Sequence, residues 1–547
     1  MQPAAPPLDV NAAELEALLE GVREALGDAG YQKLKAAIRT LSYVTELLEN
    51  REATLRMLRR LLCQARTEKT ETVLQQAGMQ GSRTKQKQTA EGTAKSPAAG
   101  HGRNGAEAYS GAHRVEVSHA SLRQGERCPE CQRGKVYPLR DPGLLVRLKG
   151  QAPIEATVYV LEKLRCNLCG ETFTANAPEG VGKNKYDETA ASMIALLRYG
   201  SGFPWHRLAG LEKSLGIPLP AATQCEIVTE VADAIRPAMG ELIRQAAQGE
   251  VFHNDDTSMP VLTLRRNLTQ DQDGNEDETD FGERTGVFTS GIVSTAQGQN
   301  VALFFTGRQH AGENLADVLK RRAAELAPPM QMCDALSRNL PKLPEKLEII
   351  VGHCLAHARR RFVEVAPNFP EECRLVLEQL GEVYHNDARA REQGLRPEER
   401  LRFHQLYSGA VMEQLHDWLA AQLTEKKVEP NSGLGVAIRY LLKHWNRLTL
   451  FLRQAGAPLD NNVCERALKK AILHRKNSLF YKTQNGARVG DLFMSLIHTC
   501  ELCGANPFDY LNQLQKHPAE LARNPSQWMP WNYRAQLEPF GIGLDSG

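Results

Sequence analysis

Residues 252–261, FHNDDTSMPV, decide the fold predicted for this chain, because they place two adjacent carboxylates, Asp255 and Asp256, after an apolar start. The alternating run VLTL follows at 261–264, so we predict that the acid pair lies in or beside a β-strand. Side chains alternate between the faces of a strand, so only one of the two carboxylates can face a given site. A carboxylate on a core strand is costly unless it is paired or binds a metal. The alternative is an acidic strand end or turn, since Asp is a common turn former.

Two later stretches favour a metal site over an acidic turn. Residues 330–335, MQMCDA, form a short apolar run that leads to Asp334. In residues 459–473, LDNNVCERALKKAIL, the apolar positions fall at helical spacing after Asp460, a residue type that caps helices, and Glu465 lies within this helix. Two strand-borne Asp and one helix-borne Glu suit a site for two divalent cations, because hard oxygen ligands hold magnesium or manganese.

The motif words of these stretches resemble those of insertion sequence 66 family transposases. The resemblance is carried by DDT at 255–257, CDA at 333–335, DNNVCERAL at 460–468 and HRKNSLFYKTQNGA at 474–487, and it covers most of the chain. It implies a catalytic core of the ribonuclease H type, in which Asp255, Asp334 and Glu465 are the catalytic acids and hold two Mg²⁺ or Mn²⁺ ions. Two words depart from the common pattern, because Asp256 and Ser258 stand where DETP is usual and CDALSRN replaces a DGYxGY word.

The function that this resemblance implies is that of a bacterial, cytoplasmic DNA transposase. Such an enzyme would cleave the ends of its element with the help of bound metal and join them to target DNA. It would bind double-stranded DNA, namely the terminal repeats of its element and the target DNA. It would act as a homo-dimer or higher assembly, together with small accessory proteins of the same element. Two alternatives stay open, namely a related acidic-triad nuclease or integrase and a non-catalytic, DNA-binding relic of a transposase.

Length and composition set outer bounds on this reading. The chain has 547 residues, about three or four domains of ordinary size, and 42% of the residues are hydrophobic. No run of about 18 apolar residues occurs, and the start MQPAAPPLDV lacks the features of a signal peptide, so we expect no membrane span and no export. The 12 Cys then indicate a reducing cytoplasm. Because the net charge is only +2, DNA binding must come from local clusters.

The N-terminal part divides into a Leu-rich helix and a linker. Residues 1–66 are predicted to form a helix or coiled coil, because five Leu recur at sevenfold spacing, although Arg51 would weaken a continuous seam: Leu34, Leu41, Leu48, Leu55 and Leu62. The alternative is an amphipathic helix packed on its own domain. Residues 67–112 have almost no large apolar side chain and are predicted to form a flexible linker.

Residues 113–182 contain two CxxC pairs, the pattern of a zinc ribbon. The pairs stand about 35 residues apart and supply four candidate zinc ligands, Cys128, Cys131, Cys166 and Cys169. The alternating stretch 154–164 is predicted to supply the strands. Because all four positions would be protein ligands, we expect the zinc to be structural.

Residues 183–249 are predicted to be a helical, DNA-binding region. Helices are expected at 190–199, 205–215 and 222–239, and the break LGIPLPAAT gives the last two the appearance of a helix-turn-helix. Its recognition face would include Thr223, Gln224 and Glu226. An all-helical lead-in to the catalytic core would give the same pattern.

The fold class that we predict is therefore multidomain α+β, with a ribonuclease H-like α/β core interrupted by a helical insertion. The first part of the core, 250–350, should contain the Asp255 strand, strands at 286–294 and 301–305, a helix at 313–326 and the Asp334 strand. The remaining parts are the insertion at 351–456, the second part of the core with Glu465 at 457–515, and a C-terminal tail at 516–547.

The insertion opens with VGHCLAHARRRFVEV, where metal binding and DNA binding compete as explanations. His353, Cys354 and His357 are candidate metal ligands, and the two His would share a helix face if both lay in one helix. The Arg run that follows is suited to bidentate phosphate contacts and consists of Arg359, Arg360 and Arg361.

A second group of candidate DNA contacts surrounds Glu465. Basic side chains neutralise phosphates, and Asn or aromatic side chains can read or stack on bases. The predicted contact residues in this group are Asn461, Asn462, Arg466, Lys469, Lys470, Arg475, Lys476 and Asn477. The alternative is an ordinary solvated helix face.

Overall fold

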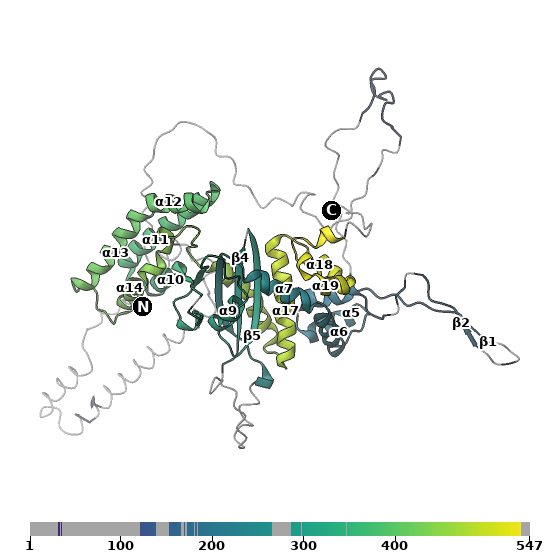
Figure 1. Cartoon of the computed structure of the whole chain (residues 1–547), viewed down its shortest axis with the longest axis horizontal. Helices are drawn as coiled ribbons and strands as arrows, with labels where there is room; N and C mark the ends of the chain where they lie inside the picture. Colours follow the sequence, from purple (N-terminus) through teal and green to yellow (C-terminus); the bar gives the residue numbers. More distant parts are fainter. Residues whose placement is uncertain are drawn as a thin grey trace. The chain divides into compact units, whose positions relative to one another are not determined.

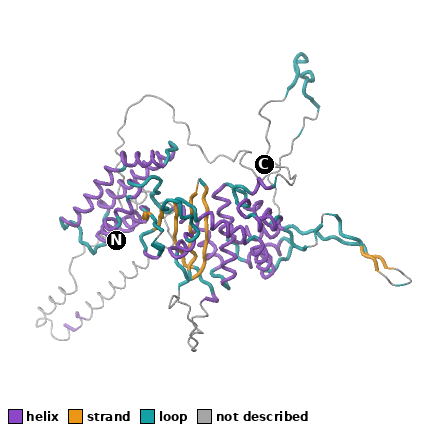
Figure 2. Tube along the Cα trace, viewed as in Figure 1, coloured by secondary structure: helices purple, strands orange, loops and turns teal. Residues whose placement is uncertain are grey.

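The central strand of a five-stranded mixed sheet contains both residues of the acid pair. This strand, β3 (Val251–Ser258), pairs antiparallel with β4 (Phe288–Ala296) and parallel with β6 (Met330–Cys333). β5 (Gln299–Gly307) lies beyond β4 and β7 (Ile350–His353) lies beyond β6, which gives the strand order β5-β4-β3-β6-β7. Figures 1 and 2 show these strands between helices of the same unit.

The computed structural model describes residues 31–32, 34–35, 70, 117, 121–137, 152–165, 169, 172–179, 181–182, 184–264, 286–296, 298–345 and 347–537. The predicted coiled coil at 1–66 and linker at 67–112 therefore lie almost wholly outside the described residues. Contacts divide the chain into one unit of Met1–Ser82 with Ala366–Arg374 and a second unit of Arg83–Val365 with Leu375–Gly547. The sheet and the site belong to the second unit.

The predicted order of three strands, a helix and a fourth strand is confirmed, with corrections at the ends of elements. The helix, α9 (Ala311–Leu319), begins after the capping residue His310 and ends seven residues before the predicted 326. The run 261–264 is not a strand, because only Val261 forms a bridge, to Tyr481, and residues 262–264 are helical. Strand β7 was not predicted, since its four residues directly precede a helix and show no period of their own.

Helix α17 (Gln484–Cys503) covers the free edge of the sheet along β5 (Figure 1). An uncovered edge strand would leave a row of backbone groups without partners. Here Ser495 Oγ accepts a hydrogen bond from the Phe304 amide at 2.9 Å, and Thr499 Oγ1 accepts one from the Ala302 amide at 3.1 Å. Asp491 Oδ2 accepts a third, from the Thr306 amide, at 2.7 Å. Small polar side chains at helical spacing on α17 thus accept hydrogen bonds from the backbone amides of β5, and the helix covers this strand.

Within the described stretch 184–250, five helical segments precede the sheet: α4 (Glu188–Ala195), η2 (Leu196–Gly200), α5 (Trp205–Ser214), α6 (Ala221–Ala234) and α7 (Arg236–Ala246). The single helix predicted at 222–239 is therefore wrong. It divides at Ile235, because Pro237 in the first turn of α7 cannot continue the hydrogen-bond ladder of α6. Gln224 of the proposed recognition face is buried, and its Nε2 donates to the Leu219 carbonyl at 2.7 Å.

The span between β7 and the second part of the core is helical, as predicted. It contains α10 (Leu355–Val365), α11 (Pro370–Glu392), α12 (Pro397–Tyr407), α13 (Gly409–Thr424), α14 (Gly433–Lys443), α15 (Trp445–Leu448) and the short η4 (Leu450–Leu452). The chain then enters α16 (Asn462–Ser478), which packs on β3 and β4 and begins the second part of the core.

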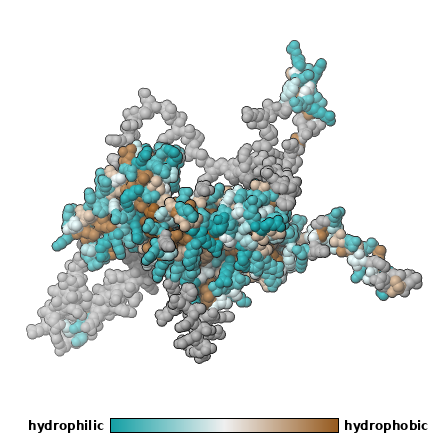
Figure 3. Space-filling view, in the orientation of Figure 1, coloured by the Kyte–Doolittle hydropathy of each residue, from teal (hydrophilic) through white to brown (hydrophobic). Residues whose placement is uncertain are grey.

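The C-terminal part continues as short helices rather than the irregular tail that we predicted from 516. These elements are α18 (Pro507–Lys516), α19 (Pro518–Arg523), η5 (Pro525–Gln527) and η6 (Tyr533–Gln536). The buried Tyr510 hydroxyl donates to the Trp528 carbonyl at 2.8 Å and so ties η5 to α18. Figure 3 shows a mainly hydrophilic face with scattered hydrophobic residues. None of the described helices is long and apolar enough to cross a membrane.

The strands near the CxxC pairs differ from the prediction. Of the stretch 154–164, expected to supply the strands, only 163–164 lie in one, β1 (Lys163–Arg165). It pairs with β2 (Thr172–Thr174) as an antiparallel hairpin that flanks the second CxxC pair. The alternation of apolar and polar residues therefore extends over more residues than the strand does, because a strand also needs a partner strand to pair with.

Candidate active site

The two aspartates predicted to lie on strands are side by side, with Asp255 within β3 and Asp334 directly after the last residue of β6. The parallel register of β3 and β6 pairs His253 with Met332, and two residues further it brings Asp255 opposite Asp334. Asn339, at the end of η3 (Ser337–Asn339), bridges them: its Nδ2 donates to Asp334 Oδ1 at 2.5 Å and lies 3.3 Å from Asp255 Oδ1. The sequence analysis did not identify Asn339, which lies five residues after Asp334 in CDALSRN.

Among the described residues, the groups that shift the pKa of Asp255 include other carboxylates and no cation. Burial and the neighbouring Asp334 carboxylate raise the pKa of Asp255 to about 7. The hydrogen bonds that Asp255 accepts, from the Asp256 amide at 2.8 Å and from Asn339, are both from uncharged donors. Two carboxylates are hard oxygen ligands, so the residues present fit a divalent cation such as Mg²⁺.

Asp256, the other member of the acid pair, has a separate set of partners. Its side chain is 1% exposed, and it contacts His310 Nδ1 at 2.8 Å and Arg338 Nη2 at 3.5 Å. The two adjacent carboxylates thus lie in different environments. Asp256 contacts a histidine and an arginine, whereas Asp255 lies next to another carboxylate, that of Asp334.

Helix α16 brings Glu465 close to the same strand because Gly291 lets the helix approach. Gly291 lies opposite Asp255 in β4, and a Cβ there would come within 3.0 Å of the Leu468 side chain. Cys464 Sγ donates to the Gly291 carbonyl at 3.3 Å. The buried Asn461, just before the helix, contacts His253 Nδ1 at 3.2 Å and donates to the Asn254 carbonyl at 3.1 Å. These contacts fix the first turn of α16 against β3.

The Glu465 carboxylate itself contacts helix α10. Its Oε1 lies 3.5 Å from His357 Nδ1 and its Oε2 lies 3.6 Å from Arg360 Nη2. His357, Arg360 and Asp334 line one cavity of about 270 Å³. In the part of the chain that the structure describes, the Glu465 carboxylate pairs with His357 and Arg360 and not with Asp255 or Asp334. The structure therefore brings the two aspartates together and places Glu465 with residues that border the same cavity.

The candidate metal ligands of the insertion are not arranged as predicted. His353 is the last residue of β7 and His357 lies in α10, so the shared helix face is wrong. The His353 ring is buried 5.0 Å from the His444 ring, and burial lowers its pKa to about 4. Cys354, His357 and Glu465 instead form a group whose ligand atoms all lie within 4.8 Å of one another.

The predicted DNA contacts fall into three groups by exposure. Arg359 and Asn461 are buried, so neither offers surface to a ligand. Several others are paired within the protein: Asn462 with Asp460, Lys470 with Glu501, Asn477 with the Gly202 carbonyl, Arg360 with Glu465, Arg361 with the Tyr440 ring, and Arg475 with Thr257 and Ser258. Arg466, Lys469 and Lys476 are exposed.

An apolar tip, which includes two aromatic residues of the predicted DNA-contact cluster, Phe480 and Tyr481, stands beside the end of β3. Tyr481 is buried, and its amide and carbonyl pair with the Pro260 carbonyl and the Leu262 amide at 2.9 Å each. The two residues before it, Leu479 and Phe480, are 64% and 41% exposed. Leu479 has φ 67°, a backbone conformation that strains a side-chain-bearing residue. The fold thus holds two apolar side chains in solvent next to Arg475.

The first CxxC pair forms a knuckle, and part of the second pair lies outside the described residues. Cys131 Sγ accepts a hydrogen bond from the Gly134 amide at 3.5 Å, and the Cys128 amide donates to the Gly134 carbonyl at 2.8 Å. Cys169 is exposed at the turn between β1 and β2, and Cys166 is not among the described residues. The zinc ribbon remains a prediction.

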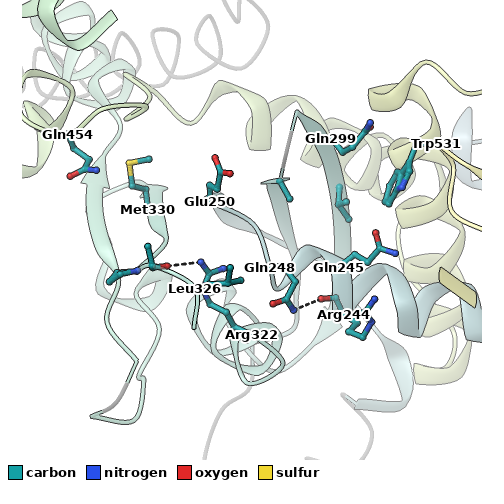
Figure 4. A pocket seen from close by; sticks show the side chains of 14 residues that line it. Arg244, Gln245, Gln248, Glu250, Gln299, Arg322, Leu326, Met330, Gln454 and Trp531 are labelled. Atoms are coloured by element: carbon teal, nitrogen blue, oxygen red, sulfur yellow. Dashed lines mark hydrogen bonds between the residues drawn. The ribbon is translucent and has the colours of Figure 1, made fainter. Parts of the chain in front are cut away.

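A larger cavity, of about 730 Å³, lies at the opposite ends of the strands, beside Glu250 and Met330 (Figure 4). The half-buried Arg322 on its wall donates to the carbonyls of Ala247, Gly249 and Ala327 at 2.7–3.0 Å. Two of the three guanidinium nitrogens thus bond to backbone carbonyls, and no pair of carboxylates lines this cavity. The acidic end of the sheet is therefore the stronger candidate for chemistry.

Comparison with known proteins places this site within a family match. The sequence profile of the family described as "Transposase IS66 family" matches residues 183–489. Three uncharacterized proteins of Sinorhizobium fredii (strain NBRC 101917 / NGR234) are similar to the chain. y4jD is 35% identical over 34% of this chain and 36% of its own length, y4hP is 23% identical over 69% and 67%, and y4qI is 24% identical over 65% and 64%. The chain thus spans about a third of y4jD and about two thirds of the other two.

Proposed function

The chain belongs to the IS66 transposase family, whose profile covers more than half of it, and we propose from this that it is a DDE-type DNA transposase. In this proposal it cleaves DNA at the ends of its element and transfers the strands to target DNA. The observation that carries the proposal is the juxtaposition of Asp255 and Asp334 through Asn339 at the end of parallel strands. The strand order β5-β4-β3-β6-β7 supports a core of the ribonuclease H type.

The residues proposed to hold two Mg²⁺ or Mn²⁺ ions are Asp255, Asp334 and Glu465. Bound there, the metals would activate the attacking oxygen and offset charge on the leaving oxygen. Asn339 orients the two aspartates through its amide, and the covering of β5 by α17 keeps the sheet rigid behind them. His357 and Arg360 hold Glu465 at the border of the cavity that Asp334 lines.

The surface proposed for DNA lies around the outer side of α16. Arg466, Lys469 and Lys476 are exposed there and can neutralise phosphates. Arg475 donates to Thr257 and Ser258, so it ties this surface to the end of the strand that contains Asp255. Exposed aromatic side chains can stack on bases, a role open to Phe480. A structural zinc at Cys128, Cys131, Cys166 and Cys169, a homo-dimer or higher assembly and a cytoplasmic location remain part of the proposal.

The experiment that tests this function is a cleavage and strand-transfer assay on DNA that carries the element's own terminal repeats. Asp255→Asn, Asp334→Asn and Glu465→Gln should each lower cleavage at least about 1000-fold, because metal clamping contributes several kcal/mol and each 1.36 kcal/mol is tenfold. DNA affinity should be unchanged or slightly higher, since negative charge is removed.

The matched control is Asp317→Asn, which removes an exposed carboxylate paired with Lys320 on α9. It should cleave like the unmodified protein. Cleavage without strand transfer would favour the nuclease alternative, and DNA binding without cleavage in the unmodified protein would favour the relic. Full cleavage by all three triad variants would refute the active site.

A further inference from the structure

A second cluster of metal-ligating atoms lies beside the two aspartates. Cys354 lies between β7 and α10, His357 lies in the first turn of α10, and Glu465 lies in the first turn of α16. One sulfur, one ring nitrogen and one carboxylate oxygen from these residues all lie within 4.8 Å of one another. Three ligand types from two segments distant in sequence, 354–357 and the first turn of α16, are thus brought together.

The sulfur is held in place by backbone contacts. Cys354 is fully buried, and its Sγ accepts a hydrogen bond from the Asn461 amide at 3.2 Å. The next amide, that of Leu355, donates to the Leu459 carbonyl at 3.0 Å. The start of α10 is therefore fixed to the segment that leads into α16.

The other two ligand atoms are buried without hydrogen-bond partners. His357 Nδ1 and Glu465 Oε1 are both inaccessible to solvent and accept or donate no hydrogen bond, although they lie 3.5 Å apart. Arg360 contacts the other carboxylate oxygen, Oε2, so Oε1 is left for a further partner. Buried polar atoms without partners cost free energy, and a shared cation would satisfy both.

We propose that Cys354, His357 and Glu465 form a site for a zinc-class divalent cation. Sulfur and imidazole ligands select zinc and related borderline metals, whereas Mg²⁺ prefers all-oxygen sites. Binding replaces the thiol proton, which is released to solvent, and leaves a fourth position for water or another ligand. His353 takes no part, because it lies on β7 against His444.

A consequence of this site, which rests on the proposed function, is competition for Glu465. A carboxylate held by a cation at Cys354 and His357 is not available to the Asp255–Asp334 pair. Zinc-class cations should therefore inhibit Mg²⁺-dependent cleavage, and the inhibition should require Cys354.

The binding test uses Co²⁺, whose thiolate bonds give a charge-transfer band in the near ultraviolet, and full-length protein with Cys128→Ser and Cys131→Ser to remove the ribbon. This protein should bind one Co²⁺ with thiolate character. Cys354→Ser and His357→Gln should each lose that band, and Cys503→Ser, which changes a half-buried thiol on α17, should keep it. Circular dichroism checks that each variant is folded. The same band in folded Cys354→Ser or folded His357→Gln would overturn the site.

The inhibition test titrates Zn²⁺ into the Mg²⁺ cleavage assay. The Zn²⁺ concentration for half inhibition should rise at least about tenfold in Cys354→Ser, because the loss of one contact to the metal weakens metal binding by at least about that factor. Equal inhibition of both proteins would overturn the competition while the Co²⁺ result still decides the site. Lack of any Mg²⁺-dependent cleavage would instead count against the proposed function and leave the Co²⁺ result unaffected.

Discussion

The helical insertion and the sheet each bury an aspartate, and they treat its charge in opposite ways. In the insertion, Asp387 of α11 is 2% exposed, and its carboxylate contacts Arg400 Nη2 at 2.6 Å, His404 Nε2 at 3.2 Å and the Arg391 guanidinium. In the sheet, Asp255 contacts uncharged donors and lies next to the Asp334 carboxylate. The first carboxylate has more than enough positive charge around it, and the second has none that the structure shows.

The pKa values follow from this difference. Hydrogen bonds from His404 and Arg400, with the charges of the arginines, outweigh burial and lower the pKa of Asp387 to about 2. Burial and Asp334 raise the pKa of Asp255 to about 7. A carboxylate whose charge the fold compensates is part of the scaffold, and a carboxylate whose charge it leaves uncompensated is suited to bind a cation.

The largest stability effect is expected from Asp387→Asn. Removing one partner of a buried charge network leaves the others uncompensated, so the free energy of unfolding should fall by about 3–5 kcal/mol. Denaturant titration measures this change. In the unmodified protein the contribution of Asp387 is present above pH 3.8 and is lost as the pH falls through about 2. A loss below about 1 kcal/mol would show that Asp387 is not the compensated charge that its contacts indicate.

Asp255→Asn is expected to raise the free energy of unfolding when no divalent metal is present, in contrast to Asp387→Asn. A raised pKa means that the folded state binds the proton more tightly, so the unmodified protein loses stability as the pH rises from 3.8 to about 7. The variant cannot titrate there, so it should be the more stable protein above pH 7, by up to about 4 kcal/mol. Melting temperatures in EDTA between pH 4 and pH 8 test this, and added Mg²⁺ should reduce the difference. If Asp255→Asn were less stable than the unmodified protein at every pH, Asp255 would not be the uncompensated charge that the comparison with Asp387 requires.

The smallest effect is expected from Asp256→Asn, which sharpens the comparison within one strand. Asp256 resembles Asp387 in having partners, His310 and Arg338, so its loss should destabilise the fold by about 1–3 kcal/mol. Because it does not contact Asp334 or Asn339, cleavage by the folded variant should be retained. Loss of cleavage in folded Asp256→Asn, with normal cleavage by Asp255→Asn, would assign the active site to the other face of β3.

The sequence predicted the acidic end of the sheet because local patterns determine it. Short apolar runs that lead to Asp residues located β3 and β6, although the alternating run 261–264 lies beyond β3, and helical spacing located α16. Asn339, Gly291 and Arg338 could not be found in this way, since each acts through a contact between segments distant in sequence. Their positions depend on strand register, which no single segment specifies.

The predictions that the structure corrected were wrong because sequence periodicity does not show where a helix or strand ends. His353 and His357 have the spacing of a helix face, but β7 ends at His353 and the chain leaves the sheet before α10 begins. The run 154–162 alternates without a partner strand, and 222–239 reads as one helix although Pro237 divides it. Periodicity identifies which structure a segment can form, and partners and prolines decide where that structure stops.

The most direct test of the central claim, that Asp255 and Asp334 form the metal site, is Mn²⁺ binding to the full-length protein followed by electron paramagnetic resonance. The unmodified protein should bind Mn²⁺, and Asp255→Asn and Asp334→Asn should each weaken that binding at least about tenfold. Asp256→Asn, one residue away in the same strand, should bind as the unmodified protein does. Unchanged affinity in both Asp255→Asn and Asp334→Asn, or a loss confined to Asp256→Asn, would contradict the assignment.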